Sequence, residues 1–257
     1  MTTILSVVVA SIVAMLTGSA PAPALTVSAA VSLTDALEDV GRAYRASGGG
    51  EVRFNFAGSN VLARQIVNGA PVDLFVSADQ AQMKVVEDAG ALAPGTRVDL
   101  LRNQLAVVLS SSAPAIATVQ ELTQPAIRRI ALGDPEAVPA GVYARQYLQA
   151  VNLWAALERR VVPLSNVRAA LTAVSTGSAD VAIVYRSDLQ AARGARLGFV
   201  ITGTGAPAIV YPAAVVKASK QRAEAERFLA FLRGAEAAAL FTRYGFEPVV
   251  NVTVPSR

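Results

Sequence analysis

Residues 52–79 read VRFNFAGSNVLARQIVNGAPVDLFVSAD, and this stretch contains a complete strand–helix–strand unit. Residues 52–56 alternate between apolar and polar side chains, as expected of a strand with one buried face. Apolar residues then recur at helical spacing over 62–67, and the Asn-Gly pair that follows is typical of a helix end. The apolar run at 73–77 predicts a second, buried strand. A strand, a helix and a strand in this order predict two parallel strands joined by the helix.

The same alternation extends in both directions from this unit. Further strands are predicted at residues 25–30, 105–110, 130–132, 161–162, 181–185 and 209–216, the last interrupted by Pro212. One helical pattern begins at Ser32, and another includes Met83 and Val86. Helical periodicity is also present over residues 143–151, over 167–174 and, in two stretches joined at Gly234, over 220–244. This order predicts an α/β fold of two lobes, each a mainly parallel sheet flanked by helices, connected by more than one chain crossing. The cleft between such lobes is a common place for a ligand.

The composition limits the chemistry that the chain can perform. Its 257 residues are 53% hydrophobic, which is enough for a packed core, and 23 basic against 19 acidic residues give a net charge of +4. No run of Lys or Arg is dense enough to follow a nucleic-acid backbone, so no nucleic-acid partner is expected. The chain has no Cys and no His, which excludes disulfides, thiol nucleophiles, a lipid-anchored Cys and Ser–His–Asp catalysis.

The N-terminal segment has the features of an export signal. Residues 1–24 carry no charged side chain, and the apolar stretch 4–16 is shorter than the roughly 20 residues that a membrane-spanning helix needs. Small residues and an Ala-Pro-Ala pattern ending at Ala24 follow, so cleavage after about Ala24 and a periplasmic location are predicted. The alternative is an uncleaved membrane anchor, since no Lys or Arg precedes the apolar stretch.

Four predicted helix starts carry small or hydroxyl residues, namely Ser32, Ser59, Ala140 and Val167. Main-chain N–H groups at a helix N-terminus lack partners and lie at the positive end of the helix dipole, so they favour anions. Each position also has an ordinary structural explanation. The two serines fit helix caps, Ser32 with a capping-box residue three positions later, while Ala140 fits a plain helix start and Val167 a core position. Tyr185 ends an apolar strand, where its ring packs or its hydroxyl faces a ligand.

Several segments together are similar to one family of proteins. They are VSAAVSLTDAL (27–37), FNFAGSNVLARQIVNGAPVDLFVSAD (54–79), ALGDPEAVPAGVYARQYL (131–148), NVRAAL (166–171), ADVAIVYRSD (179–188) and FTRYGFEPV (241–249). In this order, over about residues 25–250, they resemble the periplasmic molybdate-binding proteins of ABC transporters. Those proteins are type II periplasmic binding proteins. The resemblance implies their two-lobed fold, with residues 1–24 as signal peptide, 25–104 and 211–257 as lobe I, and 105–210 as lobe II.

The resemblance also implies an oxyanion site made of neutral donors in the cleft between the lobes. The hydroxyl and main-chain groups of Ser32 and Ser59 would bind the ligand. So would the main-chain N–H groups of Ala140 and Val167 and the hydroxyl of Tyr185. No catalytic residue, cofactor or direct metal ligand is implied, because molybdenum is bound as its oxyanion.

Three positions beside these residues depart from the family pattern. Gly58 and Asn60 flank Ser59 where related proteins often have a serine-rich run, and Arg186 follows Tyr185 where a small residue is frequent.

The implied ligand is molybdate or tungstate, and the implied partner is the membrane permease of a molybdate ABC transporter, with the binding protein a monomer. Both anions offer acceptors only, which suits a site of donors, whereas phosphate keeps a proton near neutrality and needs an acceptor. A receptor for another tetrahedral oxyanion such as sulfate is the first alternative. A transcription-factor effector domain is a second, disfavoured by the export signal, and a hydrolase is a third, disfavoured because His, Cys and a G-x-S-x-G turn are absent.

Overall fold

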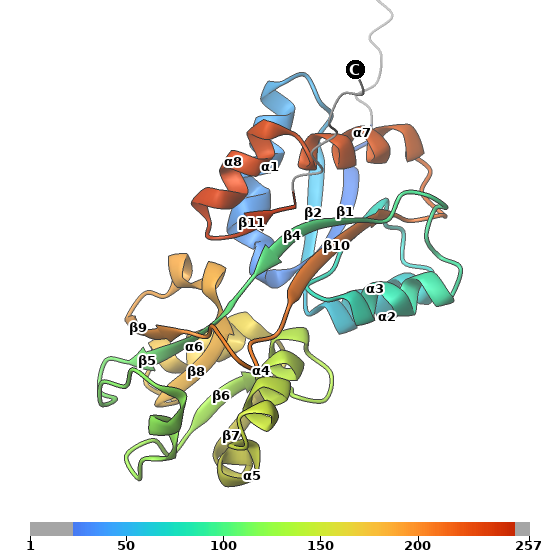
Figure 1. The fold of residues 1–257 in the computed structure, drawn as a ribbon. Helices are drawn as coiled ribbons and strands as arrows, with labels where there is room; N and C mark the ends of the chain where they lie inside the picture. Colours follow the sequence, from blue (N-terminus) through green and yellow to red (C-terminus); the bar gives the residue numbers. More distant parts are fainter. Residues whose placement is uncertain (1–22, 250–257) are drawn as a thin grey trace, which may run out of the picture.

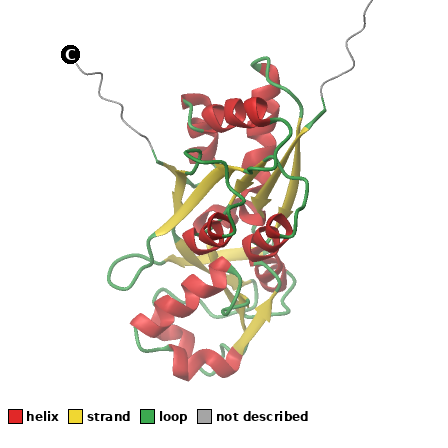
Figure 2. Ribbon diagram, turned by 90° about the vertical axis from the view of Figure 1, so that its right-hand side faces the viewer, coloured by secondary structure: helices red, strands yellow, loops and turns green. Residues whose placement is uncertain are grey.

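The computed structural model describes residues 23–249, which form two lobes (Figure 1). Nearly all of the predicted export signal, residues 1–22, lies outside the described residues. One lobe is built on a six-stranded sheet of order β11-β4-β10-β3-β1-β2, and the other on a five-stranded sheet of order β7-β6-β8-β5-β9. We call these sheets, with the helices that pack on them, lobe I and lobe II. The two lobes lie one above the other in a view turned by 90° as well (Figure 2). The predicted two-lobed α/β architecture is confirmed.

Lobe I contains both ends of the described chain. Its strands are β1 (Leu25–Ala30), β2 (Val52–Ala57), β3 (Leu74–Val76), β4 (Val98–Asn103), β10 (Ile209–Val215) and β11 (Glu247–Pro248). Its helices are α1 (Thr34–Ala46), α2 (Ser59–Val67), α3 (Gln80–Asp88), α7 (Arg222–Leu232) and α8 (Ala235–Arg243), and the short 3-10 helix η1 (Val31–Leu33) leads into α1. Helices α1, α7 and α8 cover one face of the sheet and α2 and α3 the other (Figure 1). Both faces of the sheet are therefore buried. Strand β3 shows this directly, because Phe75 packs in one core cluster with Leu62 and Met83, whereas Leu74 and Val76 on either side of it belong to the main core.

Lobe II is one continuous part of the chain. Its strands are β5 (Leu105–Ser110), β6 (Ile130–Gly133), β7 (Val161–Leu164), β8 (Val181–Tyr185) and β9 (Ala195–Val200). Its helices are α4 (Pro139–Ala150), α5 (Trp154–Leu157) and α6 (Val167–Ser175), with 3-10 turns η2 (Val119–Thr123), η3 (Glu158–Arg160) and η4 (Arg186–Ala191). Strands β5, β6 and β8 are buried at every residue, which is why they are readable as apolar runs in the sequence.

The chain crosses between the lobes twice. Strand β4 ends at Asn103 and β5 begins at Leu105, so a single residue, Gln104, separates strands of different sheets. The return runs from β9 to β10. The expectation of mainly parallel sheets holds only for β1, β2 and β3 and for β6, β7 and β8. Every pair that involves β4, β5, β9, β10 or β11 is antiparallel; β4 and β5 carry the chain out of lobe I, and β9 and β10 carry it back.

Strand β10 is continuous through Pro212, where the sequence predicted an interruption. The register against β4 shifts between Tyr211 and Pro212, since a proline has no N–H to donate to the ladder. Such an irregularity re-aims the neighbouring side chain, and Tyr211 is the residue beside it.

Candidate functional site

A small pocket lies between the two lobes. It is lined from lobe I by Ala30, Val31, Ser32, Ala57, Gly58, Ser59 and Ala78, and from lobe II by Val138, Pro139, Ala140, Asn166, Val167 and Tyr185. All five predicted site residues are among them, although they come from five separate segments of the chain. The pocket is small, about 210 Å³ even when the part open to solvent is included, so it suits a ligand of a few atoms such as a small ion. None of the lining side chains carries a charge.

The two serines do not cap the helices that they adjoin. Helix α1 begins at Thr34, and no side-chain bond caps it, so the capping box suggested by Ser32 does not form. Gly58, not Ser59, is the cap residue of α2. The Ser59 hydroxyl accepts a hydrogen bond from the main-chain N–H of Ala78 at 2.9 Å. That N–H can only donate, so the proton of Ser59 remains available to the pocket.

Lobe II presents two helix N-termini to the pocket. Pro139 is the first residue of α4, where its fixed φ suits the helix and its missing N–H has no intrahelical role. Ala140 follows it in the first turn. Val167 is the first residue of α6, and Asn166 caps this helix by accepting from the N–H of Ala169 at 2.9 Å. The N–H groups of Ala140 and Val167 lie in first turns, where no intrahelical acceptor exists, so they are free to bind an anion.

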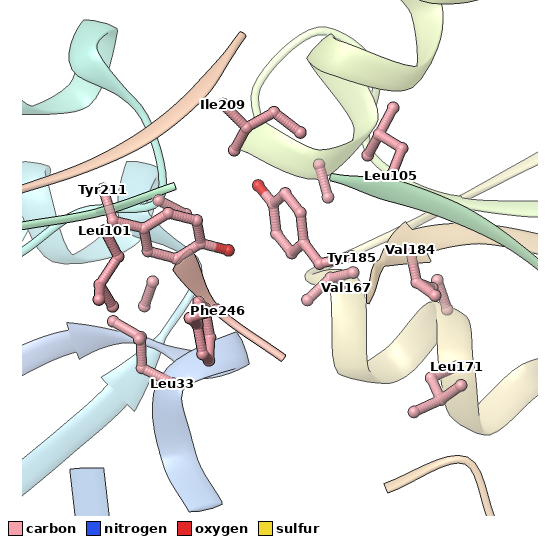
Figure 3. Close-up of a cluster of buried hydrophobic side chains, with 14 of the residues drawn as sticks. Leu33, Leu101, Leu105, Val167, Leu171, Val184, Tyr185, Ile209, Tyr211 and Phe246 are labelled. Carbon is pink, nitrogen blue, oxygen red and sulfur yellow. The ribbon is translucent and has the colours of Figure 1, made fainter. Parts of the chain in front are cut away.

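Tyr185 contributes the most unusual polar atom of the pocket. Its side chain is 1% exposed, and its hydroxyl has no hydrogen-bond partner among the described residues. Burial, reinforced by nearby Tyr211, raises the pKa of the Tyr185 hydroxyl well above its ordinary value, so the group keeps its proton. The rings of Tyr185 and Tyr211 face each other from the two lobes, edge to face, at 5.6 Å between centroids (Figure 3). Buried hydrogen-bond donors in proteins normally have an acceptor, and an anion bound in the pocket would be the acceptor for this hydroxyl.

Arg168 links the two lobes beside the pocket. Its Nη2 donates to Asp35 Oδ2 of α1 at 2.7 Å, and its Nε lies 2.8 Å from Asp188 Oδ1 in an ion pair without hydrogen-bond alignment. Asp188 also accepts the main-chain N–H of Tyr185 at 3.1 Å. Burial raises the pKa of the Asp188 carboxyl to about 6, and the Arg168 charge opposes that rise. No local pattern in the sequence indicates this link, because its three members are far apart in the chain.

The departures from the family pattern have distinct positions. Gly58 lies where the lobes meet, since a Cβ built on it would be 3.3 Å from the carbonyl oxygen of Ser165 and 2.7 Å from Asn60 Oδ1. Asn60 Oδ1 is buried without a partner in the described chain. Arg186 lies beside the crossing between the lobes, with its Nη1 3.2 Å from Gln104 Oε1. Its charge is therefore not part of the pocket lining.

Within residues 23–249, no group of three or more Asp or Glu side chains is placed to hold a metal ion. No helix there is long and apolar enough to cross a membrane.

Two lobes joined by a double crossing, with a small pocket of neutral donors between them, define a solute-binding protein. Residues 25–247 match the family described as bacterial extracellular solute-binding protein, and the chain belongs to that family. Several relatives carry the name molybdate-binding protein ModA. The one from Escherichia coli is 38% identical over 86% of this chain and 88% of its own length. The one from Haemophilus influenzae is 33% identical over 86% of this chain and 89% of its own length.

Solved structures give a consistent comparison. The periplasmic molybdate-binding protein of Azotobacter vinelandii superimposes with a TM-score of 0.76 at 27% identity, covering 86% of this chain and 98% of that protein. The sulfate-binding protein SubI of Mycobacterium tuberculosis reaches 0.77 at 19% identity, covering 88% and 87%. At that identity the second comparison concerns the fold alone.

Proposed function

We propose that this chain captures molybdate in the pocket between its lobes and delivers it to the membrane permease of an ABC transporter. The observation that carries the proposal is a set of neutral donors converging from both lobes on one small pocket, among them the unpartnered hydroxyl of Tyr185. Relatives similar over most of their length carry the name molybdate-binding protein. The proposed ligand contacts are Ser32, Ser59, Ala140, Val167 and Tyr185.

The chemistry of the pocket explains why molybdate fits. Molybdate is a dianion with four acceptor oxygens and no proton near pH 7, and every group proposed to contact it is a donor. Phosphate retains one proton at that pH, and the pocket lining has no carboxylate to accept it. Sulfate has shorter bonds to oxygen, so a cavity of molybdate size leaves its hydrogen bonds long. Tungstate nearly equals molybdate in size and charge, and we propose that it binds too.

The proposal includes how the protein works. The two lobes, which change over close to the predicted boundaries 104/105 and 210/211, close on the ligand by hinge motion at the two crossings. The closed monomer is the form that the permease recognises. The chain acts by binding, without a cofactor and without catalysis. Export to the periplasm, with cleavage after about Ala24, places it where the anion is captured.

Calorimetric titration of the anion-stripped protein tests this function. We expect tight one-to-one binding of molybdate and tungstate, weaker binding of sulfate and little heat with phosphate. Ligand at 100 times its dissociation constant stabilises the native state by about 2.7 kcal/mol, so melting temperature gives an independent check. Tighter binding of sulfate than of molybdate would replace the proposed ligand, and equal affinity for all four anions would contradict the donor argument.

A further inference from the structure

A chain of buried polar groups extends from the pocket into the crossing between the lobes. Ser32 Oγ lies 3.1 Å from the hydroxyl oxygen of Tyr211 in β10. That oxygen accepts from Nδ2 of Asn103, the last residue of β4, at 3.3 Å. The same Nδ2 donates to Ser187 Oγ at 2.9 Å. All four residues are at most 6% exposed, so within the described chain these groups depend on one another for hydrogen bonds.

The direction of these hydrogen bonds follows from one main-chain donor. The N–H of Gln104 donates to Asn103 Oδ1 at 2.9 Å, and an N–H cannot accept. The amide of Asn103 is thereby fixed, with its NH₂ group toward Tyr211. Tyr211 accepts from that NH₂ group, so its own proton must go elsewhere. Among the described residues, Ser32 Oγ is the acceptor within hydrogen-bond distance of the Tyr211 hydroxyl.

The opposite direction leaves a buried proton unused. If Ser32 donated to Tyr211, the Tyr211 proton would have no acceptor in the described chain, and Ser32 would have spent its only proton away from the pocket. The ordered chain Gln104 N–H to Asn103, Asn103 to Tyr211, and Tyr211 to Ser32 satisfies every member. It leaves the Ser32 proton directed at the pocket. Ser59 reaches the same condition through the N–H of Ala78.

We propose that Asn103 and Tyr211 are positioning residues that hold Ser32 as a hydrogen-bond donor and thereby make the pocket reject oxyanions that carry a proton. The inference rests on the proposed function and adds the device that gives its selectivity. A monoprotonated dianion such as hydrogen arsenate must donate its own proton. Each serine accepts from a protein donor and directs its own proton at the pocket, so the proton of the ligand meets a donor there and not an acceptor. Arsenate is the sharper probe than phosphate, because it is nearer to molybdate in size.

The Tyr211→Phe substitution tests the proposal. Phe keeps the ring contacts with Tyr185 at 5.6 Å and with Phe246 at 5.5 Å, but removes the hydroxyl that occupies Ser32. Ser32 then turns to donate or accept as the ligand requires. We expect the ratio of the arsenate and molybdate dissociation constants, measured by calorimetry near pH 7.5, to fall about tenfold or more, the value of one hydrogen bond to a charged ligand.

A matched control removes a buried hydroxyl of lobe I outside the pocket lining. Tyr44 is 3% exposed and donates to Glu224 at 2.7 Å, and Tyr44→Phe should leave the ratio unchanged. The Asn103→Asp substitution provides a second route. Its carboxylate draws the Tyr211 proton away from Ser32, and its charge repels both dianions alike, so the ratio again falls even if all affinities drop.

A double-mutant cycle separates hydrogen-bond direction from general loosening of the crossing. In a Ser32→Ala background, Tyr211→Phe should no longer change the ratio. A ratio that stays at the parent value in both Tyr211→Phe and Asn103→Asp overturns the proposal, and so does an equal change with and without Ser32. If the parent binds another oxyanion in place of molybdate, the proposed function fails and the ratio against that anion still decides the inference. If it binds none, both fail.

Discussion

Replacing Tyr185 by Phe separates the contribution of one hydroxyl to ligand binding from its contribution to the fold. The hydroxyl is buried without a partner in the described chain, whereas the ring packs against Tyr211. Phe keeps the ring. The anion-free protein therefore loses no hydrogen bond, and it is relieved of an unpaired polar group whose burial costs about 1–3 kcal/mol. We expect the free energy of unfolding of anion-free Tyr185→Phe to equal or exceed that of the parent.

The affinity of Tyr185→Phe for molybdate, in contrast to its stability, should decrease. A hydrogen bond to a charged group contributes about 1.5–3 kcal/mol, so the dissociation constant should rise roughly ten- to over a hundredfold. Calorimetry gives that constant, and chemical denaturation of the anion-free protein gives the free energy of unfolding. Tyr44→Phe serves as the mirror-image control, because it loses the hydrogen bonds with Glu224 and Arg227 and should be about 1–2 kcal/mol less stable with unchanged affinity. A Tyr185→Phe protein that binds molybdate as tightly as the parent would refute the placement of this hydroxyl on the ligand.

The other predictions concern lobe II and its link to lobe I. Val167→Pro should keep α6, because proline suits the first position of a helix. Molybdate affinity should fall about tenfold or more, because the substitution removes one N–H donor. If the variant has the circular dichroism of the parent and binds molybdate equally well, this N–H does not contact the ligand. Asp35→Asn removes the charge of the interlobe ion pair with Arg168 and should raise the molybdate dissociation constant about two- to fivefold, chiefly through faster release in stopped flow. Glu38→Gln, the same charge change on an exposed position of α1, should have no effect, and equal effects of the two would indicate bulk electrostatics. Burial raises the pKa of the Asp188 carboxyl to about 6 in the native state, above its value in the unfolded chain. Between about pH 7 and pH 4 the native state therefore binds more protons at this group than the unfolded state does. The contribution of this carboxyl to the free energy of unfolding should increase as pH falls through that range. The difference in unfolding free energy between the parent and Asp188→Asn should show that increase, and a difference that is flat with pH contradicts it.

The parts of the site that the sequence predicts are those fixed by short-range chemistry. Pro139 at the first turn of α4 and Asn166 as the cap of α6 are local signals, so the free N–H groups behind them could be located without a structure. Tyr185 could be located as the end of a wholly apolar strand. The sequence thus locates each of these residues separately. That they meet in one pocket was predicted only from the resemblance to the family.

The parts that could not be predicted depend on distant residues. Ser32 fitted a capping box with its near neighbours, but its hydroxyl pairs with Tyr211, 179 positions away. Strands β4 and β9 were missed because half-exposed side chains interrupt their apolar pattern. The link from Asp35 through Arg168 to Asp188 is equally non-local, and no spacing rule connects its members.

The position of β10 in its sheet has a consequence for the order in which the protein matures. Strand β10 lies between β3 and β4, so the centre of the lobe I sheet stays open until residues 209–215 have been added. The strands of lobe II, by contrast, are contiguous in the chain and can pair as soon as residue 200 is available. A growing or translocating chain therefore assembles one half of the pocket early and lacks the other, together with Tyr211, until nearly its whole length has emerged. A chain that ends before β10 is therefore expected to lack a cleft that can hold the anion.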